Sequence, residues 1–139
     1  MFTRVLRRTV ARDHGAVVVP ELILAVDDSM SMRQLVRATL QGAGYRIAQA
    51  ANGVEALEYA KTQEAPRLVL TDVNMPEMDG LTLVRELRAL PDYRHIPILV
   101  LTTESGADLK KRAKEIGATG WIVKPFSPQE LLATVKRVI

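Results

Sequence analysis

The sequence contains no cysteine and only two histidines among its 139 residues. The absence of cysteine excludes disulfides, thiolate metal sites and cysteine nucleophiles, and two histidines argue against a histidine-rich metal site. Aromatic residues make up only 4% of the chain, fewer than a single-stranded nucleic-acid platform needs for stacking bases. No apolar run approaches the roughly 18 residues of a membrane span, so no transmembrane helix is predicted.

Positive charge is concentrated at the N-terminal end of the chain. Residues 1–20 hold four arginines and one aspartate, which account for the whole net charge of +3, whereas residues 21–139 hold 15 basic and 15 acidic side chains. We therefore predict a basic N-terminal extension over residues 1–20 and one neutral domain over residues 21–139, with no nucleic-acid partner. The apolar stretch 16–19 is too short for a secretory signal, so a cytoplasmic protein is expected.

On a helical wheel the extension is amphipathic. Its four arginines fall on one side, and the opposite side carries a mainly apolar set: Phe2, Val5, Leu6, Thr9 and Val10. This pattern is compatible with a membrane surface, with a partner groove, or with docking on this domain or another copy. Because about three turns are marginal for an isolated helix in water, an extension without function is an equal alternative.

Strand-like and helix-like segments alternate through residues 21–139. The strand-like segments are residues 22–26, 45–50, 68–71, 96–101 and 121–123. The helical patterns that follow them begin near Ser29, Asn52, Gly80, Ser105 and Ser127. Five strands alternating with five helices predict an α/β fold, a doubly wound parallel sheet with helices on both faces.

The helical patterns also predict buried faces and caps. Apolar residues spaced by three and four place Leu35 on the buried face of the first helix and Val54 behind the start of the second. Ser105 is expected to cap the fourth helix. Ser127 should cap the fifth in a capping box with Glu130.

Chemically active side chains stand where the predicted strands end. They are Asp27, Asp28, Asp72, Thr102 and Lys124, and in such a sheet the site lies at the carboxyl ends of the strands. Three neighbouring carboxylates repel one another unless a cation neutralises them, and their hard oxygen atoms suit Mg²⁺. One carboxylate can attack phosphorus to form an acyl phosphate, while a metal, an ammonium and a hydroxyl offset the charge of the transferring group.

Four short motifs lie at these positions: Asp27-Asp28, Asp72-Val73-Asn74-Met75-Pro76, Thr102, and Lys124-Pro125-Phe126. They resemble the receiver domain of bacterial two-component response regulators. The separations along the chain are 45, 30 and 22 residues, and they match the stand-alone chemotaxis (CheY-like) receiver without gaps. The resemblance implies a flavodoxin-like fold, in which five parallel strands have the order 2-1-3-4-5 and five helices cover them.

The resemblance implies a role for each acid. Asp72 would be the phosphoacceptor. Asp28 would bind Mg²⁺ directly, Asp27 would hold metal-bound water, and Asp72 and the backbone carbonyl of Asn74 would complete the protein's share of the coordination. Asn74 and Glu104 would flank the phosphoryl group and tune its hydrolysis.

The remaining roles implied by the resemblance concern stabilisation and switching. Lys124 would pair with the phosphoryl group, and a cis Lys124–Pro125 peptide would aim its side chain into the site. Thr102 would donate its hydroxyl to a phosphoryl oxygen, and Trp121 would be the switch aromatic. Most relatives have Tyr, Phe or His at that position, so Trp121 is bulkier than usual.

The function implied is a phosphorylation-activated signalling switch without an output domain of its own. A sensor histidine kinase or phosphotransfer protein would phosphorylate Asp72, and a downstream protein, such as a flagellar motor or another regulator, would respond. The only reactions catalysed would be its own phosphoryl transfer and self-dephosphorylation. An aspartate-nucleophile phosphatase is the alternative, but such enzymes place a second Asp where this sequence has Asn74. A flavin or nucleotide binder is a third class, and its glycine-rich motifs are absent.

Overall fold

The computed structural model describes residues 19–104 and 106–139. Residues 1–18 of the predicted extension, and the predicted cap Ser105, lie outside the described residues. The strands are β1 (Leu22–Val26), β2 (Arg46–Ala50), β3 (Leu68–Asp72), β4 (Ile98–Thr102) and β5 (Gly120–Val123). The helices are α2 (Met30–Gly42), α3 (Gly53–Thr62), α4 (Gly80–Arg88), α5 (Ala107–Glu115) and α6 (Pro128–Val138). A short 3₁₀ helix, η1 (Pro91–Tyr93), was not predicted.

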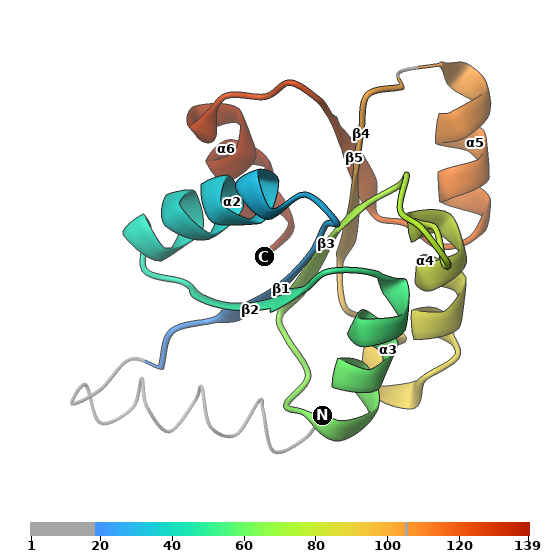
Figure 1. Ribbon diagram of the computed structural model, residues 1–139, viewed down its shortest axis with the longest axis horizontal. Coiled ribbons are helices and arrows are strands. Elements are labelled where there is room, and N and C mark those ends of the chain that lie inside the picture. Colours follow the sequence, from blue (N-terminus) through green and yellow to red (C-terminus); the bar gives the residue numbers. More distant parts are fainter. Residues whose placement is uncertain (1–18, 105) are drawn as a thin grey trace.

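The strands form one sheet in the order β2-β1-β3-β4-β5. All four neighbouring pairs are parallel. Helices α2 and α6 cover one face of the sheet, and α3, α4 and α5 cover the other (Figure 1). The predicted doubly wound topology and strand order are therefore confirmed, and the carboxyl ends of all five strands meet at one edge.

Alternating strand residues build a core on each face of the sheet. Leu24 and Val69 pack with the helices of the α3–α5 side, whereas Ile23 and Leu70 pack with α2 and α6. Because both faces are covered, the central strands are apolar at almost every position, as parallel sheets require. This packing fixes the strand ends and the loops that follow them.

Two predicted core positions are exposed. Leu35 is 40% exposed, because α2 buries Val36 and Leu40 instead. Val54 is 47% exposed, and α3 buries Ala56 behind it. In both helices the predicted apolar stripe is wider than the face that the sheet covers.

The predicted caps differ between the last two helices. Helix α6 begins with the predicted capping box of Ser127 and Glu130. The N-cap of α5 is Gly106, which makes no side-chain hydrogen bond, and the predicted cap Ser105 lies outside the described residues. Among the described residues, no helix is long and apolar enough to cross a membrane.

Arg88 joins three segments at the far end of α4. Its guanidinium donates hydrogen bonds to the carbonyl oxygens of Tyr93 (2.7 Å), Ile96 (2.6 Å) and Gly117 (2.8 Å). Burial lowers the pKa of the guanidinium. Gly117 has a φ of +100°, which favours glycine. The end of α4, the segment before β4 and the loop between α5 and β5 are thereby tied together.

Candidate functional site

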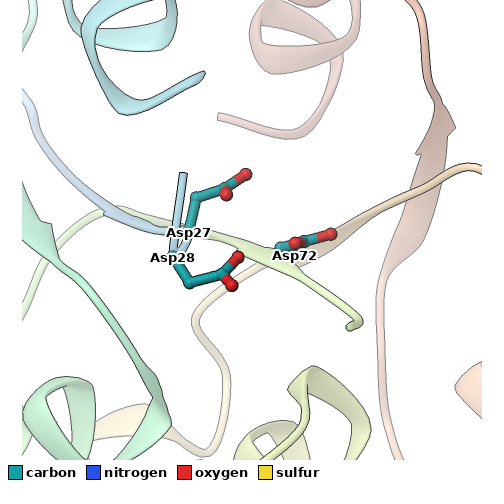
Figure 2. A group of neighbouring side chains, drawn as sticks. All are labelled: Asp27, Asp28 and Asp72. Carbon is teal, nitrogen blue, oxygen red and sulfur yellow. The ribbon is translucent and has the colours of Figure 1, made fainter. Parts of the chain in front are cut away.

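Three carboxylates meet at the carboxyl edge of the sheet. Asp27 and Asp28 follow β1, and Asp72 ends the neighbouring strand β3. Each offers one oxygen, and these three atoms lie within 4.8 Å of one another (Figure 2). Asp27 is 3% exposed and Asp72 8% exposed, whereas Asp28 is open to solvent. The cluster therefore has a buried floor and an accessible side.

Lys124 reaches this cluster from the end of β5. Its Nζ donates to Oδ1 of Asp72 at 3.1 Å and to Oδ2 of Asp27 at 3.3 Å. Its backbone N–H donates to the carbonyl oxygen of Thr102 at 2.7 Å. The Lys124–Pro125 peptide bond is cis. One ammonium group thus bridges two buried carboxylates that come from different strands.

Burial and charge shift the pKa values of this pair. Burial raises the pKa of Asp72, and the negative charge of Asp27 raises it further, against the opposing effect of Lys124. For Lys124, burial acts to lower the pKa, but the hydrogen bond to Asp72 and the charges of both aspartates outweigh it and raise the pKa. The raised pKa of Asp72 means that one lysine does not fully offset the cost of ionising this carboxylate.

Hydrogen bonds from the β1–α2 loop and neighbouring elements fix Asp27. Its Oδ1 accepts from the Ser29 N–H at 2.9 Å, and its own N–H donates to the Ala50 carbonyl at 3.1 Å. The Asp27 carbonyl accepts from Arg33. Because these contacts set its orientation, the carboxylate is held in place before any ligand arrives.

Gly80 lies directly against the main chain of Asp72. A Cβ at Gly80 would stand 2.0 Å from the Asp72 carbonyl oxygen. The Gly80 N–H donates to the carbonyl of Val73 at 2.8 Å. The start of α4 therefore positions the loop after Asp72. Sequence reasoning placed a helix start here but gave Gly80 no role, because the contact is between backbones.

Thr102 is buried at the end of β4, at the same edge of the sheet. It is 1% exposed, and its Oγ1 accepts from the Glu104 N–H at 2.9 Å. Asn74 and Glu104 are exposed in the loops after β3 and β4. Trp121 is 38% exposed on β5, outside the acid cluster. The structure thus brings the predicted acids and the predicted lysine together. It places the predicted switch aromatic, Trp121, on β5 three residues before Lys124, away from the acids.

Comparisons with known proteins agree with this fold and site. Residues 23–136 match the family described as the response regulator receiver domain, and the chain belongs to this family. Receivers are the phosphorylation-activated signalling switches of two-component systems, and the similarities below place this chain in the CheY-like, flavodoxin-like group.

The chain is 41% identical to the chemotaxis protein CheY1 of Helicobacter pylori strain J99 over 118 residues, which cover 84% of this chain and 95% of the relative. The chemotaxis response regulator CheY4 of Vibrio cholerae is 47% identical with a TM-score of 0.84, over 87% of this chain and 100% of that one.

The receiver domain of sensor histidine kinase PA1611 from Pseudomonas aeruginosa PAO1 is 29% identical, with a TM-score of 0.79, over 86% and 98% of the two chains. Its structure has a magnesium ion coordinated in the active site cleft.

Proposed function

We propose that Asp72 accepts a phosphoryl group from the phosphohistidine of a sensor histidine kinase or phosphotransfer protein, with Mg²⁺, and that the phosphorylated domain then changes its affinity for a downstream protein. The observation that carries this proposal is the cluster of Asp27, Asp28 and Asp72, whose oxygens lie within 4.8 Å of one another. The bridging position of Lys124 supports it. The proposed receiver unit is residues 21–139, in the cytoplasm, with residues 1–20 as a basic extension.

The donor set fits Mg²⁺. Carboxylate oxygens are the ligands this ion prefers, and it keeps several waters when few protein groups bind it. Asp27, Asp28, Asp72 and the backbone carbonyl of Asn74 would hold the ion. When bound, it would neutralise the charge between the acids and an entering phosphoryl group. The magnesium ion in the PA1611 receiver domain supports this assignment.

In the proposed transfer, a carboxylate oxygen of Asp72 attacks phosphorus. The O–P bond forms while the P–N bond to the donor histidine breaks, and the bonding electrons leave with the imidazole, which takes up a proton. The product is an acyl phosphate. The Lys124 ammonium, already 3.1 Å from Asp72, would stabilise the charge on the phosphoryl oxygens.

Thr102 would couple this event to the loop after β4. Because its Oγ1 accepts the Glu104 N–H, the hydroxyl hydrogen can be donated to a phosphoryl oxygen. Movement of Thr102 toward that oxygen would then carry Glu104 with it and pass the change to Trp121 on the neighbouring strand. Asn74 and Glu104 would tune the later hydrolysis of the acyl phosphate. The domain would thus catalyse only its own phosphoryl transfer and self-dephosphorylation, and would act on no separate substrate.

Phosphorylation by acetyl phosphate tests the proposal. We expect the protein to be labelled in Mg²⁺ and the label to be released by hydroxylamine, which cleaves acyl phosphates. Asp72→Asn should be unlabelled, and so should the parent protein in EDTA. Asp92→Asn serves as the matched control, since Asp92 is exposed in η1, on a different segment from the cluster. Labelling of Asp72→Asn equal to that of the parent would contradict the proposal.

A further inference from the structure

The exposed ring of Trp121 is in contact with the ammonium group of a lysine. Trp121 is the only tryptophan of the chain, it pairs with Val100 across the sheet, and it is 38% exposed. The Nζ atom of Lys110, on α5, lies 5.0 Å from the centroid of the indole ring. This distance is within the range of a cation–π interaction, about 6 Å. A neighbouring helix therefore restrains the exposed ring.

Trp121 is connected to the acid cluster along its own strand. Lys124 follows three residues later, and its ammonium binds Asp72 and Asp27. The Lys124 N–H also binds the carbonyl of Thr102. A change in how Lys124 is held at the cluster is therefore passed to the end of β5.

Lys110 is connected to the same cluster by a second route. Helix α5 follows the loop that starts at Thr102, whose hydroxyl holds the Glu104 N–H. The N-cap of α5, Gly106, makes no side-chain hydrogen bond, whereas Leu109 and Ala113 are buried and anchor the helix on the sheet. Displacement of the loop thus acts on the less firmly held end of α5, within one turn of Lys110.

We propose that Lys110 is a positioning residue: its contact holds Trp121 in the partly exposed arrangement of this structure, which the switch triggered at Asp72 would have to change, and Lys110 therefore opposes that switch. This inference rests on the proposed function above and adds a regulatory residue to it. A cation–π contact at an exposed site corresponds to a factor of about two to five in an equilibrium constant. Loss of the Lys110 ammonium should therefore favour the activated arrangement by about that factor.

Three variants distinguish the effect of the cation–π contact from the effect of one positive charge on α5. Lys110→Met removes the ammonium but keeps an apolar side chain on the ring. Lys111→Met removes the same charge from the next residue, which is exposed. Lys110→Arg keeps a cation that also stacks on aromatic faces. Without any ligand, the fluorescence emission of Trp121 should change in Lys110→Met and stay as in the parent in Lys111→Met and Lys110→Arg.

The fluorescence of Trp121 is then followed during titration with beryllofluoride, a phosphoryl mimic, in Mg²⁺, and the concentration at half-saturation reports how readily the domain switches. We expect half-saturation at an about two- to five-fold lower concentration for Lys110→Met, and parental values for Lys111→Met and Lys110→Arg. Equal shifts in Lys110→Met and Lys111→Met would overturn this inference alone, as would parental behaviour of Lys110→Met. A parent protein that acetyl phosphate labels, but whose Trp121 fluorescence does not respond to beryllofluoride, would also overturn this inference alone. A parent protein that acetyl phosphate does not label would overturn the proposed function, and this inference with it.

Discussion

At the scale of single residues, the charge of the site is unbalanced. Among residues 19–104 and 106–139, the three carboxylates share one ammonium group, that of Lys124, which forms ion pairs with Asp27 and Asp72. When all are ionised, the cluster keeps a net charge of two negative units, which a divalent cation neutralises. Asp28 is the exposed member, so it gives an arriving cation access from solvent.

Gly80 is the residue whose change should disturb this site most through the backbone. We expect Gly80→Ala to lower the free energy of unfolding by about 3 kcal/mol, because the added Cβ meets a main-chain oxygen that cannot move aside. Urea unfolding followed by circular dichroism measures the effect. Gly42→Ala is the control, since a Cβ there meets no atom within 4 Å. It should be neutral or slightly stabilising, and an equal loss in both variants would contradict the explanation.

The sequence identifies the chemistry of single residues better than their surroundings. Asp27, Asp72 and Lys124 could be predicted because each follows an apolar strand, and parallel strands end at one edge. The packing of Gly80 on Asp72 and of Lys110 on Trp121 could not be predicted. Those contacts join different elements, α4 with the end of β3 and α5 with β5, and a single sequence does not show how closely two elements pack.

At the scale of elements, local signals predict the strands and most helix starts. The apolar runs predict β1, β3 and β4 because these strands are buried on both faces. The exposure of Leu35 and Val54 could not be read from the sequence, because periodicity does not tell how much of a helix the sheet covers. Gly106 and η1 were missed for a related reason, since neither has a distinctive local pattern.

The capping box of α6 gives an element-scale prediction. The Ser127 N–H donates to Oε1 of Glu130 at 2.8 Å, and the Glu130 N–H donates to Oγ of Ser127 at 3.1 Å. Ser127→Ala should lower the free energy of unfolding by about 1 kcal/mol. Glu130→Gln keeps an acceptor oxygen and should cost clearly less. Both values come from urea unfolding, and a Ser127→Ala variant as stable as the parent would contradict the prediction.

At the scale of the whole molecule, the hydrogen bonds of the site connect the ends of strands β1, β3 and β5. Asp27, Asp72 and Lys124 come from the ends of β1, β3 and β5, so their hydrogen bonds span the width of most of the sheet. An ion bound by the three acids exists only when these ends are assembled. Ligands that bind only the folded state stabilise it by mass action.

Mg²⁺ should therefore stabilise the fold. At about 100 times its dissociation constant, we expect a gain of about 2.7 kcal/mol in the free energy of unfolding. Urea unfolding in MgCl₂ is compared with NaCl of equal ionic strength. Asp28→Asn should lose most of the gain, whereas Asp92→Asn should keep it. If Asp28→Asn gains as much as the parent, the exposed acid is not a ligand.

The clamp formed by Arg88 has a mechanical consequence. It holds the loop at Gly117, just beyond the C-terminal end of α5, while the opposite end of that helix begins at Gly106 without a side-chain cap. The C-terminal end of α5 is thus tied through Gly117, whereas its N-terminal end is held by the packing of Leu109 in the core and not by a side-chain cap. We therefore expect a displacement of the loop after Thr102 to tilt α5 about its C-terminal end instead of translating it.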